Sequence, residues 1–272
     1  MTQLPFGISP SHLHAVWAYR GFILGSVKRE FQSRYQNSLL GAAWTVLNPL
    51  AMILIYTVVF SQVMRARLPG AENVYSYSIY LCAGVLTWGL FAEITGRSLN
   101  VFIEHANLLK KISFPRLCLP TVVVLNAGLN FAIIFGLFTV FLLISGNFPG
   151  LAFLALIPLL AILVAFSIGL GITLGILNVF FRDVGQLFGV LLQFWFWLTP
   201  IVYPASVLPE WARPIIGLNP LANLMEGYQT ILVKGQWPHW RSLWLVTMLS
   251  VLLCALGIWL FRKHAGEMVD EL

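Results

Sequence analysis

Residues that could carry out chemistry are scarce in this chain of 272 residues. Aspartate occurs only at Asp183 and Asp270, so no Asp-x-Asp pair could hold a metal-bound sugar nucleotide. His12 and His14 form a His-x-His pair, but it stands in a polar segment without further metal ligands beside it. No GxxxxGK[ST] sequence occurs, so the chain lacks the phosphate-binding loop of Walker-type ATPases. We therefore expect no catalytic site, metal site or cofactor in this chain.

The composition indicates a membrane protein. Hydrophobic residues make up 59% and charged residues only 10%, against about a quarter charged in soluble domains. Cys82, Cys118 and Cys254 lie in or beside apolar stretches without Cys-x-x-Cys spacing, which argues against disulfides or zinc. The net charge of +6 fits Lys and Arg enrichment in membrane-flanking loops. No basic stripe interleaved with aromatics occurs in a polar segment, so we expect no nucleic-acid partner.

Almost no ionisable residue lies inside the apolar runs. Glu93 and Arg97 stand near one end of the second run. Carriers driven by protons or sodium usually need ionisable groups at membrane depth. The sequence therefore indicates that energy comes from a partner.

The apolar runs predict an all-α polytopic membrane protein with a single transmembrane domain. A span needs about 20 apolar residues, and six runs qualify: 39–64, 77–96, 117–144, 151–179, 184–202 and 242–261. The preceding segment 12–36 is expected to be an amphipathic helix in the membrane interface, with Val27, Phe31 and Tyr35 facing lipid. Lys and Arg predominate in the segments on the side of the two termini, which predicts that both termini are cytoplasmic.

The long segment 203–241, between the fifth and sixth spans, is predicted to form two short re-entrant helices on the outer side. Asn219 suits an N-cap and Pro220 the first position of a helix. A seventh span is rejected, because Asn219, Pro220, Asn223 and Glu226 are costly or disruptive in lipid. Within the fourth span, Ser167, Gly171 and Gly175 form a stripe of small residues that predicts close helix packing inside one protomer.

Four groups of residues, in this order, resemble the ABC-2 type polysaccharide export permeases. They are Arg34-Tyr35-x-x-Ser38-x-Leu40-Gly41-x-x-Trp44 with Asn48-Pro49, the run from Asn107 to Arg116, Asn178-x-x-Phe181-Arg182-Asp183-Val184, and Thr199-Pro200 with Asn219-Pro220. The first group includes the interface-helix motif Arg34, Tyr35, Ser38, Gly41 and Trp44. The resemblance covers nearly the whole chain. It is nearest to exporters of O-antigen and common polysaccharide antigen, with capsule and teichoic-acid permeases next.

The resemblance implies the transmembrane subunit of an ATP-driven exporter in the bacterial inner membrane. It implies a homodimer of this chain, joined to two cytoplasmic ABC ATPase subunits that hold ATP and Mg²⁺. It also implies an O-antigen-like polysaccharide linked to undecaprenyl diphosphate as substrate. In the family the dimer contact lies mainly on the first and fifth spans.

The resemblance also implies that the cytoplasmic loop 97–115 docks on the ATPase. The residues that we expect to contribute are Asn107, Lys110, Lys111, Phe114 and Arg116. The alternative is that these cations only anchor a helix end among lipid headgroups. Arg182 and Asp183 are expected either to form a local ion pair that caps two helix ends, or to let Arg182 contact the ATPase or the lipid diphosphate.

Aromatic side chains are candidates for the translocation path, because their faces stack on sugar rings with few directional bonds. The candidates are Tyr56, Phe60, Trp88, Trp195 and Tyr203. The alternative is that they pack in the core or face lipid. Two other function classes stay open: an ABC-2 permease for another substrate (capsule, teichoic acid or a drug), and a secondary carrier or channel.

Overall fold

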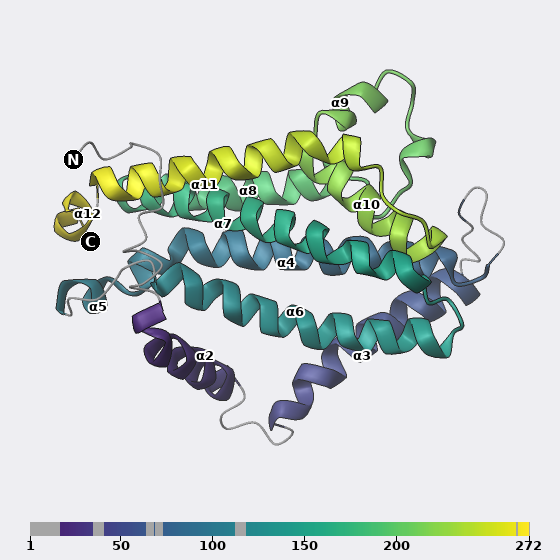
Figure 1. Cartoon of the computed structure of the whole chain (residues 1–272), viewed down its shortest axis with the longest axis horizontal. Helices are drawn as coiled ribbons and strands as arrows, with labels where there is room; N and C mark the ends of the chain where they lie inside the picture. Colours follow the sequence, from purple (N-terminus) through teal and green to yellow (C-terminus); the bar gives the residue numbers. More distant parts are fainter. Residues whose placement is uncertain are drawn as a thin grey trace.

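The computed structural model describes residues 17–34, 41–63, 68, 73–111, 118–264 and 266–271, and every regular element in these ranges is a helix. Four long helices lie along the long axis of the molecule (Figure 1): α4 (Ser76–Glu104), α6 (Cys118–Ile144), α7 (Leu156–Phe180) and α11 (Trp244–His264). The turns η3 (Gly150–Ala155) and η5 (Trp240–Leu243) precede α7 and α11. All four helices are long and apolar enough to cross a membrane.

Two further apolar helices are shorter than the predicted first and fifth spans. α3 (Trp44–Thr57) follows a 3-10 turn, η1 (Gly41–Ala43), and continues as a π-helical segment, η2 (Val58–Val63). α8 (Asp183–Leu198) ends before residue 202, because Thr199 precedes Pro200 and is extended, with φ −103° and ψ 132°. By length and composition alone, four spans therefore stand out in the described part of the chain.

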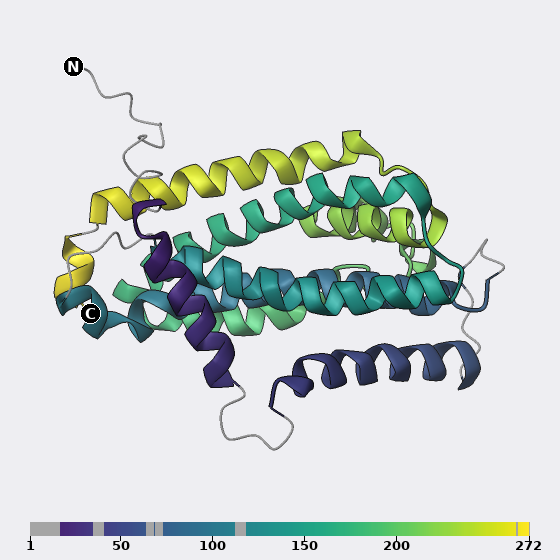
Figure 2. The ribbon, with the colours of Figure 1, turned by 60° about the horizontal axis from the view of Figure 1, so that its bottom comes forward.

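α2 (Arg20–Arg34) crosses the bundle obliquely near one of its ends (Figure 2). The predicted lipid-facing stripe is wrong at Val27, which packs with the buried Ile23 against Cys118 and Val122 of α6. The face that contacts α6 also carries Glu30, so a polar side chain interrupts the hydrophobic periodicity of the helix. Residues 12–16, 35 and 36 of the predicted interface helix lie outside the described residues.

α4 extends beyond the predicted end of the second span at residue 96. Its last turns continue to Glu104 because Val101 and Phe102 are buried against Ile176 of α7. His105 interrupts the helix, and α5 (Ala106–Lys111) follows. α5 and α12 (Glu267–Glu271) lie at the same end of the bundle (Figure 1).

We call the end of the bundle that holds α5 and α12 the basic end. Cations stand on or beside the described helix ends there, among them Lys110, Arg182, Arg262 and Lys263. At the opposite end, Trp237, Trp240 and Trp244 are all exposed, as expected for an aromatic belt at a membrane surface.

The connection between α8 and α11 contains η4 (Ala205–Val207), α9 (Arg213–Gly217) and α10 (Pro220–Lys234). In both views α8 ends about halfway along the bundle, and α10 begins at that level and continues to the end opposite the basic end (Figures 1 and 2). The predicted cap at Asn219 is confirmed, because its side chain accepts a hydrogen bond from the Leu221 amide and Pro220 is the first helical residue. α10 ends at Lys234, and the next residue, Gly235, has a φ of +64°, a left-handed conformation that favours glycine.

The predicted stripe of small residues is confirmed as a helix-packing surface within the chain. A Cβ atom at Gly171 would lie 2.6 Å from the Ser98 Cβ, and one at Gly175 would lie 2.6 Å from the Ser98 carbonyl oxygen. Gly169 is equally tight against the backbone of Cys254 on α11. α7 is therefore the central helix, and the absence of side chains at these glycines lets α4 and α11 approach it closely.

Gly175→Ala is expected to force α4 and α7 apart, because its Cβ would meet backbone that cannot rotate away. Overpacking of this kind costs about 1–3 kcal/mol. We expect the detergent-purified variant to unfold at a lower temperature. The matched control is Gly136→Ala on α6, where a Cβ would meet nothing within 4 Å. Equal unfolding temperatures for the two variants would contradict this packing.

Candidate functional site

The backbone break after α8 leaves a row of carbonyl groups without helical partners, and side chains of other helices bind them. The Tyr77 hydroxyl donates to the Val202 carbonyl at 2.6 Å. The Tyr80 hydroxyl lies 2.9 Å from the carbonyl oxygens of both Pro200 and Tyr203. From α10, Gln229 Nε2 donates to the Pro200 carbonyl at 3.0 Å. These donors satisfy the carbonyl groups of an irregular backbone segment inside an apolar bundle.

Asn219 joins the two sides of the break with four hydrogen bonds. Its Oδ1 accepts from Trp195 Nε1 at 2.9 Å and from the Leu221 amide at 3.1 Å. Its Nδ2 donates to the Leu198 carbonyl at 3.3 Å and to Thr199 Oγ1 at 3.0 Å. One amide side chain therefore begins α10 and binds the last turn of α8.

Two of the predicted path residues, Trp88 and Trp195, lie in an aromatic cluster inside the chain. Trp88 is buried, and its ring lies 5.1 Å from Phe91 and 5.6 Å from Phe196. Trp195 is half-buried, 5.4 Å from Phe91. Both residues pack α8 against α4 in this conformation, and their contact with a substrate stays a prediction.

The other predicted path residues belong to a second row of aromatic rings, between α3 and α4. Tyr56 contacts Phe60 with ring centroids 6.3 Å apart, and Phe60 contacts Tyr77 at 5.2 Å. Tyr77 stacks on Tyr80 at 6.3 Å. Tyr56, Phe60 and Tyr77 are all half-buried, so each keeps part of its ring accessible. The fifth candidate, Tyr203, lies beside this row, and its carbonyl oxygen is one of the two that the Tyr80 hydroxyl contacts.

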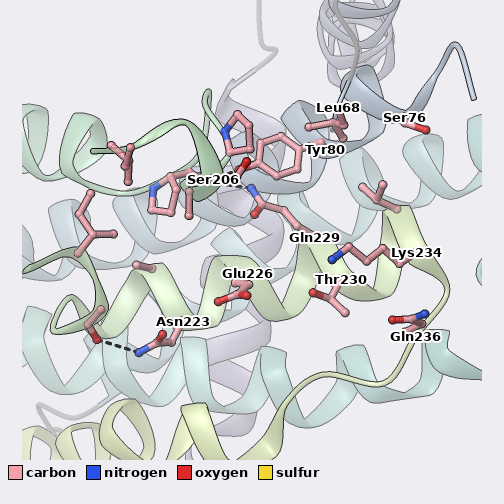
Figure 3. A pocket seen from close by; sticks show the side chains of 18 of the residues that line it. Leu68, Ser76, Tyr80, Ser206, Asn223, Glu226, Gln229, Thr230, Lys234 and Gln236 are labelled. Atoms are coloured by element: carbon pink, nitrogen blue, oxygen red, sulfur yellow. Dashed lines mark hydrogen bonds between the residues drawn. The ribbon is translucent and has the colours of Figure 1, made fainter. Parts of the chain in front are cut away.

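This row of rings ends at a cavity of about 1090 Å³ near the end opposite the basic end. Tyr80 lines it from α4, and Ser206 lines it from the segment after the break. Figure 3 shows Glu226, Thr230 and Lys234 of α10 on the other wall. The cavity is therefore large and mostly polar along α10. We call it the α10 cavity.

A cluster of charges links α2 to the bundle near the basic end. Arg97 of α4 forms an ion pair with Glu30 of α2, and its Nη1 lies 3.6 Å from Glu93 Oε1. Asn126 Nδ2 donates to Glu30 Oε2 at 2.6 Å, and Asn130 Nδ2 donates to Glu93 Oε2 at 3.0 Å, both from α6. This cluster was not predicted from the sequence, although Asn126 and Asn130, four residues apart in an apolar helix, were a usable signal.

The predicted coupling residues on α5 lie on its exposed side. Asn107 and Lys110 are exposed, whereas Leu109 is buried against Met268 of α12 and Phe102 of α4. One face of α5 is thus packed against the bundle, and the opposite face is accessible. The backbone of Lys111 ends α5, and Phe114 and Arg116 lie outside the described residues.

The loop between α7 and α8 is held by an asparagine rather than by its charged pair. Arg182 and Asp183 are both exposed, and no ion pair joins them where the structure describes the chain, so the predicted local ion pair is not formed. Asn178 Nδ2 donates to the Leu99 carbonyl at 3.2 Å, and its Oδ1 accepts from the Gly185 amide at 2.9 Å. Asp183 lies in the first turn of α8, where its carboxylate interacts favourably with the positive end of the helix dipole.

The interface-helix motif is described only in part. Arg34 ends α2, and Tyr35 and Ser38 lie outside the described residues. Gly41 has φ +48°, a left-handed conformation that glycine adopts without strain. Trp44 begins α3 and is 47% exposed.

These helices define the class of the protein. Apolar helices of spanning length with exposed apolar faces describe a polytopic membrane protein. The sequence profile of the ABC-2 type transporter family matches residues 23–233. The chain therefore belongs to the ABC-2 type transporter family.

Three relatives match this chain over most of its length. The O-antigen export system permease protein RfbA of Myxococcus xanthus is 31% identical over 259 residues, which is 94% of this chain and 97% of the relative. A protein of the same name from Klebsiella pneumoniae is 33% identical over 236 residues, or 86% of this chain and 88% of the relative. The polysialic acid transport protein KpsM of Escherichia coli is 21% identical over 89% of this chain and 93% of its own length.

Asn219→Ala is expected to destabilise the junction of α8 and α10, because Trp195 Nε1, the Leu221 amide and the Leu198 carbonyl all lose a partner. Losing the cap and leaving these groups unsatisfied should cost about 2–4 kcal/mol. Thermal unfolding of the purified protein measures the loss.

The control for this variant is Ser242→Ala, which removes a single local hydrogen bond to the His239 carbonyl. Asn219→Asp should be intermediate, because a carboxylate still accepts from Trp195 and Leu221 but cannot donate to Leu198. The role of Asn219 is contradicted if Asn219→Ala unfolds at the same temperature as Ser242→Ala.

Proposed function

We propose that this chain is the membrane-spanning subunit of an ATP-driven exporter that moves an O-antigen-like polysaccharide, linked to undecaprenyl diphosphate, across the bacterial inner membrane. The observation that carries the proposal is the identity of 31% and 33% to proteins named as O-antigen export permeases, over nearly their whole length. The weaker likeness to a polysialic acid transport protein makes a capsule-type polysaccharide the second candidate.

The proposed topology has six spans and both termini in the cytoplasm. α4, α6, α7 and α11 are four of the spans. α3 with η2 is the first span, and α8 is the fifth, with α10 completing the distance to the outer surface. The basic end is then cytoplasmic, which is supported by the cations at its helix ends.

The proposed energy source is a pair of cytoplasmic ATPase subunits, which would hold ATP and Mg²⁺. α5 is suited to receive them, because Leu109 fixes it to the bundle while Asn107 and Lys110 stay accessible. Movement of a bound ATPase would reach α4 directly, since only His105 separates the two helices. Arg182 and Asp183 are exposed at the same end and form a second proposed contact.

The proposed assembly contains two copies of this chain, joined through α3 and α8. α8 exposes a continuous apolar stripe along its length: Leu187, Val190, Leu191, Phe194, Trp197 and Leu198. α3 and the start of η2 expose a second one: Trp44, Leu47, Leu54 and Val58. A translocation path between two protomers would then pass the accessible rings of Tyr56 and Phe60.

Aromatic rings along such a path fit a polymer that must slide. A ring face binds a sugar ring by contact area rather than by directional hydrogen bonds. The polymer can therefore advance by one unit without breaking a set of strong bonds at once.

Deleting the gene in its native host should remove the polysaccharide from the cell surface while lipid-linked polymer accumulates inside. The expected cause is that synthesis continues while the proposed transmembrane route is missing. Surface labelling with a polysaccharide-specific serum, together with extraction of lipid-linked glycan, measures both pools, and a plasmid copy of the gene should reverse both changes. Normal surface polysaccharide in the deletion strain would contradict the proposed function.

Lys110→Glu is expected to weaken binding of the ATPase subunits, because it reverses the charge of an exposed residue on α5. A lost or reversed contact of this kind typically lowers affinity by about tenfold or more. Affinity purification of the tagged permease measures how much ATPase stays bound, with two of each subunit expected for the unaltered complex.

The matched control is Arg241→Glu, the same charge reversal at an exposed residue near the opposite end of the bundle. It should retain the ATPase in full. Docking through α5 is contradicted if Lys110→Glu and Arg241→Glu retain equal amounts of ATPase at equal permease levels.

A further inference from the structure

α10 has two chemically distinct faces. Leu224, Tyr228 and Ile231 are almost fully buried in the core. The polar residues Asn223, Glu226, Thr230 and Lys234 recur at helical spacing and line the α10 cavity instead. Packing in the bundle accounts for the buried face of α10 but not for a row of polar residues along its other face.

Several polar groups on this wall keep hydrogen-bonding capacity for a ligand. Neither Glu226 nor Lys234 forms an ion pair within the described residues, and both are exposed. Asn223 uses its Nδ2 to donate to the Gly217 carbonyl at 3.2 Å, which leaves its Oδ1 available as an acceptor. The wall therefore offers a carboxylate, an ammonium group, an amide oxygen and a threonine hydroxyl.

The balance of charge on this wall limits the class of ligand. One carboxylate and one ammonium group give no net charge, whereas a diphosphate or a nucleic acid would need an excess of cations. A lipid chain would leave the polar groups unsatisfied. A hydroxyl-rich neutral molecule satisfies donors and acceptors together, and carbohydrate is the class that combines this chemistry with an affinity for aromatic faces.

The position of the cavity agrees with this class. Tyr80 lines the cavity and stacks on Tyr77, which continues to Phe60 and Tyr56. The row that begins with the half-buried rings of Tyr56 and Phe60 thus ends at the buried Tyr80, which lines the α10 cavity. The volume of about 1090 Å³ is at the upper limit of ordinary ligand sites, about 300–1,000 Å³, and can hold a short segment of glycan.

We propose that the α10 cavity binds a segment of a few sugar residues of the polysaccharide as it reaches the outer side of the membrane, with Glu226, Thr230, Lys234 and Asn223 as its hydrogen-bonding groups and Tyr80 beside them. This inference rests on the proposed function. The site holds the polymer on the exit side after each step of transport and opposes its return.

Site-specific photo-crosslinking in cells that make the polymer tests this binding site. Gln236→p-benzoylphenylalanine places a photoreactive ring at the cavity without removing a proposed binding group, and Ser206→p-benzoylphenylalanine is a second, independent position in case the first variant does not assemble. The whole transporter is expressed, the glycan is labelled by feeding a radioactive sugar, and the permease is purified after irradiation. Leu252→p-benzoylphenylalanine is the control, because Leu252 is exposed on the apolar surface of α11.

We expect labelled glycan attached to the permease at one or both cavity positions, several-fold above the Leu252 control. No adduct above the control at either position, in cells whose variant permeases still export polymer, overturns the cavity proposal and leaves the proposed function standing. Absence of export even with the unaltered chain would instead overturn the proposed function.

Discussion

The structure depends on satisfying backbone carbonyls where α8 breaks off inside the apolar bundle. Hydrocarbon offers no hydrogen-bond donors, and an unsatisfied buried polar group costs several kcal/mol, so an open break would not survive there. Here Asn219, Tyr77, Tyr80 and Gln229 supply the donors from α10 and α4. These bonds allow two shorter helices, α8 and α10, to follow one another along the apolar bundle.

The same donors determine where two rings of the aromatic row lie, the half-buried Tyr77 and the buried Tyr80. Tyr77 and Tyr80 must reach the segment after α8, so their rings stand between α3 and the break. Their ring faces then continue the row that begins at Tyr56. The tyrosines that satisfy the backbone carbonyls therefore also form part of a row of rings that suits sugar rings. The α10 cavity lies at the end of this row.

Local rules predicted some of these features and could not predict others. The cap at Asn219 was predictable because capping depends only on residues next to it in the sequence. The stripe at Gly171 and Gly175 was predictable because its spacing alone indicates that another helix packs closely there. The inward position of Trp88 did not follow, because a helix that is apolar all round shows no periodicity that separates core from lipid. The partner of Glu30 lies on α4, far away in the sequence, so only the folded structure reveals that pair.

The continuity of α4 has a mechanical consequence. This helix of 29 residues is uninterrupted from Ser76 to Glu104, a length of about 44 Å at about 1.5 Å per residue. One continuous helix thus connects His105, after which α5 begins, with Tyr80 near the opposite end of the bundle. Because a stiff helix tilts as a unit, a rotation of about 5° around its midpoint displaces each tip by about 2 Å in opposite directions. A small displacement at one end of α4 therefore moves the other end without a chain of intermediate contacts.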